Sequence, residues 1–164
     1  MEEVPKNALQ LVETMAEGGK YAAAIARLDE LGRCYPADPR VSATRAYVMG
    51  HQGDHQAAVE CWSRAIALLD EEPHYFYMRG IHLFALGRFR QAVVDFTEVV
   101  RLCDHHGSDY YRAPAHFFKA DALLQLGELQ MAEAECAQIP EDMQVWTDRL
   151  RTRANILADC RRTE

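Results

Sequence analysis

The sequence has neither long apolar runs nor an excess of basic residues. No apolar stretch approaches the roughly 18 residues that a membrane-spanning helix requires. The 18 lysines and arginines are outnumbered by 25 aspartates and glutamates, and the net charge of −7 argues against nucleic acid as the main ligand. The opening MEEVPKN carries acids where a secretory signal would carry positive charge. We therefore expect a cytoplasmic protein that binds neither membranes nor nucleic acids.

Cysteine pairs with metal-binding or disulfide spacing are also missing. The five cysteines include no CxxC pair, and their odd number does not suit a set of disulfides. The chain contains no glycine-rich phosphate loop, no G-x-S-x-G and no H-E-x-x-H. We therefore expect reduced thiols, no catalytic residues, no metal and no cofactor.

The sequence does contain an internal repeat. The segments EGGKYAAAI, HQGDHQAAV, ALGRFRQAV and QLGELQMAE align on Gly19, Gly53, Gly87 and Gly127. Two of the three intervals between these glycines are 34 residues long, and the last is 40. A fixed period of this size indicates a stack of similar supersecondary units. Two further positions recur, one seven residues before each glycine (Val12, Ala46, Gly80, Ala120) and one five residues after it (Ala24, Ala58, Ala92, Ala132).

This register predicts two antiparallel helices in each repeat. The glycine supplies a permissive backbone where the first helix ends and a tight turn begins. The residues seven before and five after it, mostly small, would face each other where the helices cross, so that the two backbones can approach closely. After Gly87, apolar residues recur at steps of three and four up to Cys103, which is typical of a helix. We find no alternation typical of a strand.

These positions resemble the tetratricopeptide repeat (TPR) family over about residues 5–140, most closely in AYVMGHQGDHQAAVECWSRAIALL and RGIHLFALGRFRQAVVDFTEVVRL. The resemblance implies an all-α fold, a right-handed α-solenoid of antiparallel helix pairs that forms a single domain over residues 1–164. We expect four repeats at about 5–38, 39–72, 73–106 and 113–140, with an insertion at 104–112.

A solenoid must end in a helix whose outer face tolerates water. We expect residues 141–162 to form this capping helix, since Pro140 suits a helix start and Arg161 and Arg162 complement the negative end of the helix. An apolar stripe from Met143 to Cys160 would cover the fourth repeat. The interspersed arginines at 149, 151 and 153 are interpreted as part of a solvated face.

By resemblance to the family, the first helices line a concave groove that holds a peptide. Its predicted centre is aromatic and aliphatic, and acids lie toward both ends, which fits an amphipathic helix or an extended segment that is apolar with some basic residues. Family members that bind acidic chaperone tails carry lysine, arginine or asparagine at groove positions where this sequence has Leu9 and Glu13, Ala43 and Tyr47, and Tyr77 and Ile81, so we do not expect it to bind such tails. The candidate groove residues are Glu13, Arg40, Tyr47, His51, His74, Tyr77, Ile81, Phe84, Phe117, Asp121 and Leu124.

The resemblance favours a protein–protein interaction module, an adaptor or scaffold. Two alternatives stay within protein binding: a dedicated chaperone, or an immunity-type partner that neutralises a secreted bacterial protein. Self-association through the apolar groove or an exposed helix is a further alternative. The last is a metal-dependent hydrolase centred on the stretch CDHHGSDYYRAP.

The stretch CDHHGSDYYRAP, residues 103–114, is where the repeat gains its six extra residues. Its thiol and two histidines are adjacent, and adjacent side chains seldom converge on one ion as a metal site requires. Nothing supplies an oxyanion hole or an orienting third group for a nucleophile. We expect the preceding helix to end near Cys103 or Asp104 and the next to have begun by about Pro114. Asp109, Tyr110 and Tyr111 are candidate partner contacts on this loop.

Overall fold

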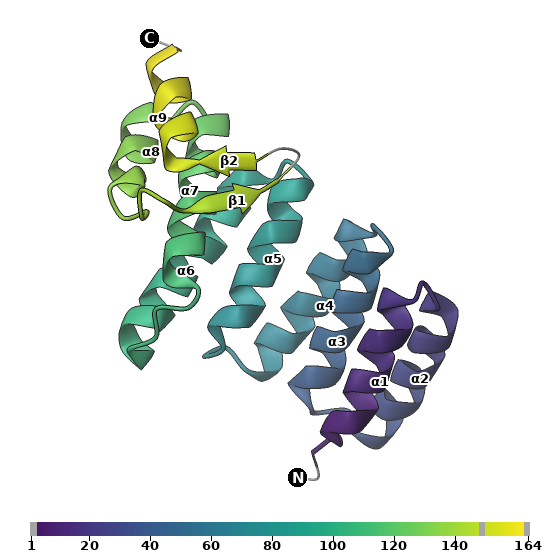
Figure 1. Cartoon of the computed structure of the whole chain (residues 1–164). Helices are drawn as coiled ribbons and strands as arrows, with labels where there is room; N and C mark the ends of the chain where they lie inside the picture. The colour runs from purple at the N-terminus through teal and green to yellow at the C-terminus, as the bar shows by residue number, and fades with distance from the viewer. Residues whose placement is uncertain (1–2, 148–149, 163–164) are drawn as a thin grey trace. The chain divides into compact units, whose positions relative to one another are not determined.

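A computed structural model of the chain describes residues 3–147 and 150–162 (Figure 1). The described residues form nine α-helices and two short strands. This confirms the all-α class expected from the repeat. The elements are α1 (Lys6–Glu17), α2 (Tyr21–Cys34), α3 (Pro39–His51), α4 (His55–Leu68), α5 (Pro73–Ala85), α6 (Phe89–His106), α7 (Arg112–Gln125), α8 (Leu129–Cys136), β1 (Gln144–Trp146), β2 (Leu150–Thr152) and α9 (Arg153–Arg162). Among them, α1 with α2, α3 with α4 and α7 with α8 form packed helix pairs.

The chain divides into two compact units, Met1–Leu86 and Gly87–Glu164, here called the N-terminal and C-terminal units. In the N-terminal unit α1 packs on α2 and α3, α2 packs on α3, α3 pairs with α4, and α5 packs on α4. In the C-terminal unit α7 packs on α6 and α8, and α9 packs on α8 and α7.

The recurring glycines lie at the turns within the helix pairs, as the period predicts. Gly19 and Gly53 have φ of 72° and 82°, a left-handed conformation that glycine adopts without a steric cost. The small residues around them are buried at the crossings, which lets the paired backbones approach closely. The valine and the six alanines at these positions have no exposed surface: Val12, Ala24, Ala46, Ala58, Ala92, Ala120 and Ala132 are each 0% exposed.

A second close approach explains one glycine inside a helix. Gly50 lies in α3, and a Cβ placed there would lie 2.7 Å from Cε1 of His82, which belongs to α5. His82 is 6% exposed, and its Nδ1 lies 3.0 Å from Nδ1 of His55 at the start of α4. The absence of a side chain at Gly50 therefore admits a buried imidazole between α3, α4 and α5.

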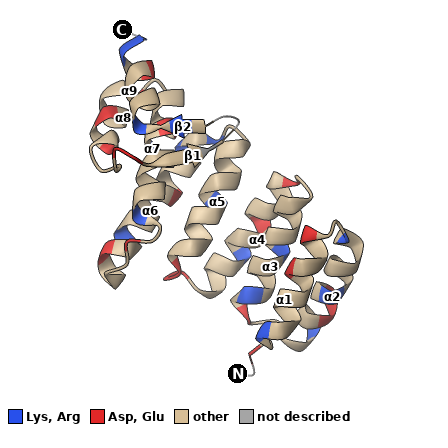
Figure 2. Ribbon diagram, in the orientation of Figure 1, with Lys and Arg blue, Asp and Glu red and all other residues tan. Residues whose placement is uncertain are grey.

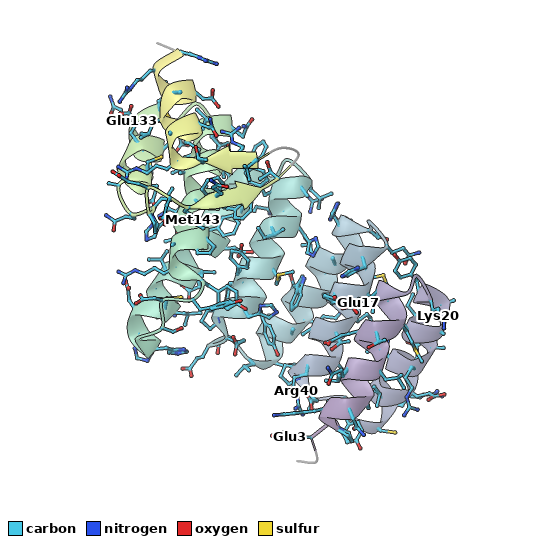
Figure 3. All side chains as sticks on the ribbon, in the orientation of Figure 1. Glu3, Glu17, Lys20, Arg40, Glu133 and Met143 are labelled. Atoms are coloured by element: carbon cyan, nitrogen blue, oxygen red, sulfur yellow. The ribbon has the colours of Figure 1, made fainter. Side chains whose placement is uncertain are left out.

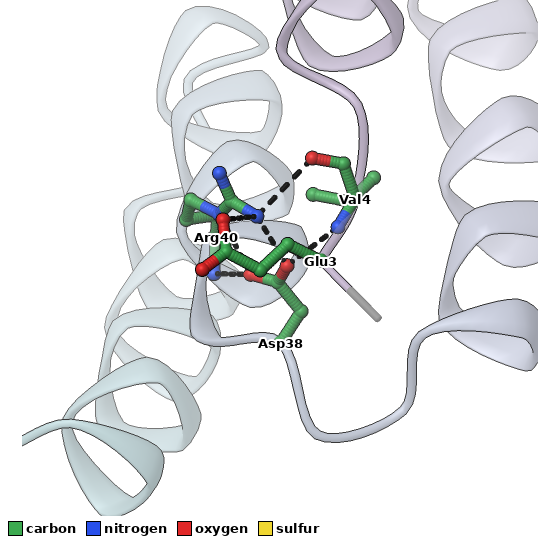
Figure 4. A network of polar contacts seen from close by, with 4 residues as sticks. All are labelled: Glu3, Val4, Asp38 and Arg40. Carbon is green, nitrogen blue, oxygen red and sulfur yellow. Dashed lines mark hydrogen bonds and ion pairs between the residues drawn. The ribbon is translucent and has the colours of Figure 1, made fainter. Parts of the chain in front are cut away.

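An Asp–Arg pair holds the start of the chain against α3 (Figure 4). The backbone N–H of Val4 donates to Oδ2 of Asp38 at 2.8 Å, and a guanidinium nitrogen of Arg40 donates to the Val4 carbonyl at 3.1 Å. The same guanidinium also donates hydrogen bonds to both carboxylate oxygens of Asp38, at 2.9 and 2.6 Å. Asp38 also caps α3 by accepting from the backbone N–H of Arg40 at 3.0 Å. One buried carboxylate therefore joins the N-terminal segment to the second repeat.

We expect Asp38→Asn to lower the free energy of unfolding by about 2 kcal/mol at pH 7, because the amide cannot replace the charge-assisted bonds. The Arg40 hydrogen bond holds the pKa of Asp38 below its usual value. The contribution is therefore complete above the ordinary aspartate pKa and is lost as the pH falls through the depressed one. Urea unfolding of wild type and variant should show a difference that shrinks in acid. Asp54→Asn, at an exposed cap of α4, is the control and should cost little.

The continuous helix predicted over residues 141–162 is wrong. Residues 144–146 and 150–152 pair as an antiparallel hairpin, and helix begins only at Arg153. Valine, tryptophan and threonine in this segment favour strand. Thr152 then caps α9, since its hydroxyl accepts from the N–H of Asn155 at 3.3 Å while Oδ1 of Asn155 accepts from the N–H of Thr152 at 2.9 Å. A shorter helix, α9, packs on α8 and α7.

The segment predicted as an insertion over 104–112 is partly helical. The preceding helix does not end near Cys103 or Asp104, because α6 continues to His106 and is closed by Gly107 in a left-handed conformation with φ of 62°. His105 and His106 are exposed in the last turn of α6, where positive charge is favourable. The next helix, α7, has begun by Arg112, so only a short connection remains.

Candidate partner-binding face

The predicted groove residues divide between the two units, so each part is described within its own unit. In the N-terminal unit, Glu13 lies on α1, Tyr47 and His51 lie on α3, and four further positions lie on α5. Since α1 and α3 pack side by side, the first three residues and Glu17 occupy adjoining helices. We call Glu13, Glu17, Tyr47 and His51 the acidic–aromatic face.

Tyr47 connects the members of this face. Its hydroxyl donates to Oε1 of Glu17 at 3.1 Å, and its ring centroid lies 4.3 Å from that of His51. The backbone carbonyl of His51 accepts from the hydroxyl of Tyr21 at 2.9 Å, which links the end of α3 to α2. Tyr47 is half-buried and Glu17 and His51 are exposed, so the face combines a held aromatic ring with accessible polar groups.

The two carboxylates of the acidic–aromatic face repel each other. Glu13 and Glu17 are one helical turn apart on α1, and burial followed by the charge of Glu17 raises the pKa of Glu13. Burial also raises the pKa of Tyr47, with further contributions from its hydrogen bond to Glu17 and from both carboxylates. No basic side chain in the described ranges pairs with Glu13 or Glu17. Like charges at this spacing destabilise a helix, and a cation at this position would relieve the repulsion.

The remaining candidates of the N-terminal unit are only partly accessible. His74, Tyr77, Ile81 and Phe84 on α5 are all half-buried. The His74 ring stands edge-on to Trp62 at 5.6 Å, and burial lowers its pKa. Figure 2 shows α5 as an almost uncharged helix, which agrees with its sequence, where Arg79 is the one charged residue. Arg40 is committed to Asp38 and Val4, and therefore belongs to the N-terminal attachment.

In the C-terminal unit, two of the three candidate groove residues are buried. Phe117 is 0% exposed and Asp121 is 2% exposed, so neither presents a surface to a partner. Asp121 contacts the hairpin, since Arg151 of β2 is itself buried and its guanidinium lies 3.3 Å from Oδ1 of Asp121 and 3.2 Å from Oδ2 of Asp159. The expectation that Arg151 belongs to a solvated face is therefore wrong. Leu124 remains half-buried.

Two of the three candidate loop residues after α6, Asp109 and Tyr110, are exposed, and Tyr111 is half-buried. Tyr110 is 77% exposed, and its ring stands edge-on to Tyr111 at 4.7 Å. Asp109 is exposed and lies 3.4 Å from Arg112, which also pairs with Asp104 at 2.9 Å. This loop is therefore fixed to the ends of α6 and α7 by ion pairs while Tyr110 projects from it.

The similarity of this chain to known proteins is a similarity of fold. No family model matches the chain. The TPR repeat-containing thioredoxin TTL4 of Arabidopsis thaliana is 39% identical over 85 residues, which are 52% of this chain but 12% of that protein. Three solved structures match most of the chain at low identity. The repeats of a Podosopora anserina kinesin light chain match with a TM-score of 0.69 at 17% identity, over 81% of this chain and 71% of that one.

The other two structures are bacterial. MamA of Desulfovibrio magneticus RS-1 matches with a TM-score of 0.68 at 17% identity, over 82% of this chain and 75% of that chain. PilF of Pseudomonas aeruginosa matches with a TM-score of 0.68 at 18% identity, over 80% and 57%. The chain has the TPR fold. The fold implied by the sequence resemblance is therefore confirmed.

Within this TPR fold, the described residues contain no group of three or more histidines, cysteines, aspartates and glutamates arranged to hold a metal ion. Cys103 is 2% exposed, and burial raises the pKa of its thiol, which disfavours the reactive thiolate. His116 pairs with Glu135 at 2.6 Å, and Lys119 takes the other oxygen at 2.7 Å. Burial opposes ionisation of Glu135, but these two bonds outweigh it and lower its pKa. This triad joins α7 to α8.

None of the helices in the described part of the TPR fold has the length and apolar composition that a bilayer crossing requires.

Proposed function

We propose that the protein is a non-catalytic protein-interaction module whose N-terminal unit binds a peptide or helical segment of a partner protein. The TPR fold supports this proposal because stacked helix pairs present extended surfaces to other proteins. The observation that carries it is the acidic–aromatic face. Two carboxylates without basic partners lie beside a held tyrosine, which favours a segment with basic residues among apolar ones.

Tyr47 and the two carboxylates of this face would contribute to partner binding in different ways. A ring such as Tyr47, already fixed by its hydrogen bond, contacts a partner at a small entropic cost. The carboxylates of Glu13 and Glu17 would favour a basic partner and reject an acidic one. The half-buried Tyr77, Ile81 and Phe84 of α5 belong to the same proposed surface and would supply apolar contacts. The biological setting we favour is that of an adaptor or scaffold.

We expect the double variant Glu13→Gln with Glu17→Gln to weaken partner binding at least about tenfold, since two desolvated charge contacts are removed. The same change should raise the free energy of unfolding by about 0.3 kcal/mol, because the like-charged pair on α1 disappears. The immobilised chain would capture its partner from a lysate of the source cells, mass spectrometry would identify it, and titration calorimetry would compare affinities.

The matched control is Glu60→Gln, which removes an exposed carboxylate from α4 and leaves the acidic–aromatic face intact. Its affinity should equal that of wild type. Equal affinity of the double variant and wild type would exclude the acidic–aromatic face as the binding surface. Light scattering across a range of concentrations separates partner binding from self-association, because a self-associating protein would grow in mass as its concentration rises.

A further inference from the structure

A pocket of about 840 Å³ opens in the N-terminal unit, away from the acidic–aromatic face. It lies where the α2–α3 connection meets the α4–α5 connection, next to the attachment of the N-terminal segment, and Glu3 and Arg40, both labelled in Figure 3, are among its lining residues. Its size is in the range of pockets that hold ligands. The lining residues are Glu3, Cys34, Tyr35, Pro36, Ala37, Asp38, Pro39, Arg40, Leu69, Glu72 and Tyr75.

The charged groups of this pocket favour a cation. Its three carboxylates, Glu3, Asp38 and Glu72, face one guanidinium, that of Arg40. Arg40 is held by both oxygens of Asp38, so its charge is already matched. Glu72 uses Oε1 to cap α5 by accepting from the N–H of His74 at 3.2 Å, and its second oxygen has no partner among the described residues. The unmatched charge of the pocket is therefore negative.

Tyr75 supplies an independent sign of a ligand. It is 6% exposed, with its ring 5.7 Å from that of Trp62. Its hydroxyl makes no hydrogen bond to any described group, although it belongs to the pocket lining. Burial, then the charges of Glu72 and Asp38, raise the pKa of Tyr75 to about 12, so the hydroxyl keeps its proton. No described group occupies this hydroxyl, so it can hydrogen-bond a ligand in the pocket.

The apolar walls define the rest of the ligand. Tyr35, Pro36 and Leu69 surround the carboxylates, and Leu69 is 41% exposed although it is a large aliphatic residue. A cation on an aliphatic stem matches this combination, because the stem covers the apolar walls while the charged head reaches Glu72. Arginine and lysine side chains have this form.

We propose that this pocket binds an arginine or lysine side chain, with its apolar neighbours, in an extended segment of a partner protein. The pocket is larger than one side chain requires, so the flanking residues enter with it. Asp38 and Arg40, which line the pocket, already bind the backbone N–H and carbonyl of Val4, so these groups are suited to holding a peptide backbone. The proposal shares with the proposed function only the premise of a protein partner, since its residues are separate from Glu13, Glu17, Tyr47 and His51.

The test uses the full chain, labelled with ¹⁵N, and the peptide acetyl-Leu-Arg-Leu-amide. We expect chemical-shift changes at the backbone amides of residues 34–40 and 69–75, and about tenfold weaker binding when norleucine replaces arginine.

Glu72→Gln keeps an oxygen to cap α5 and should weaken binding of the arginine peptide about tenfold. Tyr75→Phe should weaken it less. Glu71→Gln, an exposed neighbour that does not line the pocket, is the matched control and should change nothing.

Equal binding of the arginine and norleucine peptides would overturn the proposal, as would equal losses in Glu71→Gln and Glu72→Gln. Butylguanidinium that binds as tightly as the peptide would show a small-amine site in place of a protein-binding one. The Glu13→Gln, Glu17→Gln variant should bind the arginine peptide like wild type. Binding at this pocket and binding at the acidic–aromatic face are therefore tested independently.

Discussion

Asp121→Ala should lower the free energy of unfolding by about 3 kcal/mol, because it leaves the buried Arg151 with one of its two carboxylate partners. Arg151 is 6% exposed, and its Nε already lacks a hydrogen-bond partner among the described residues. The remaining partner, Asp159, is more exposed and cannot compensate fully. Chemical denaturation followed by circular dichroism measures the loss.

A double-mutant comparison separates this ion-pair effect from a simple loss of packing. Asp121→Leu with Arg151→Met replaces both charges by apolar groups, and buried pairs replaced in this way often lose little stability. The double variant should therefore be more stable than Asp121→Ala by at least about 1.5 kcal/mol. Additive losses from the two positions would contradict the pairing of Asp121 with Arg151.

Lowering the pH from 6.5 to 4 should cost about 3 kcal/mol of stability through His82. Burial, and then the neighbouring His55, lower the pKa of His82 to about 4 from its ordinary 6.5. Its Nε2 has no hydrogen-bond partner in the described ranges, and Gly50 closes that side of the ring. The folded chain therefore holds His82 neutral in a pH range where the unfolded chain protonates it.

The sign follows from proton counting. Between pH 6.5 and 4 the unfolded state binds a proton at residue 82 that the folded state does not, so stability falls as the pH falls. Urea unfolding at pH 7.5, 6 and 5 should show this decline, and His82→Phe should show a flatter profile. If packing beside Gly50 prevents His82→Phe from folding, His82→Gln removes the same titration. Parallel profiles for wild type and a folded variant would exclude His82 as the cause.

The helices of the repeats could be located from the sequence because each repeat encodes its own turn. Gly19 and Gly53 adopt the left-handed conformation that the turn needs, and Ala24 and Ala58 are buried at the crossings. These requirements are local and recur at a fixed interval, so the repeat pattern is sufficient to predict where the helices and turns lie. The end of α6 lies beyond the expected Cys103 or Asp104, because the helix continues to the glycine C-cap at Gly107.

The C-terminal segment could not be derived in this way because it lies outside the repeat. Its apolar residues are compatible with a helical stripe, whereas the structure has two paired strands and a contact between Arg151 and Asp121, which is distant in sequence. Phe117 and Asp121, which the repeat positions alone would place in a groove, are buried. A usable signal was present in Thr152 and Asn155, whose spacing is typical of a helix N-terminus.

The two candidate sites differ in how much of each could be predicted from the sequence. Glu13 and Tyr47 occupy equivalent positions of successive repeats, so the repeat pattern alone predicts that they lie on one face. Their hydrogen bonding through Glu17 needed coordinates. The pocket beside Tyr75 was not predicted, since it forms where two connections meet and its charge balance depends on the pairing of Arg40 with Asp38.

Amide hydrogen exchange of the chain with and without its captured partner is the most direct test of whether the first helices of the N-terminal unit bind a partner protein. We expect slower exchange in α1 and α3, around Glu13, Glu17, Tyr47 and His51, with little change in α2 and α4. Protection confined to α2 and α4, or no protection anywhere in residues 6–51, would contradict it.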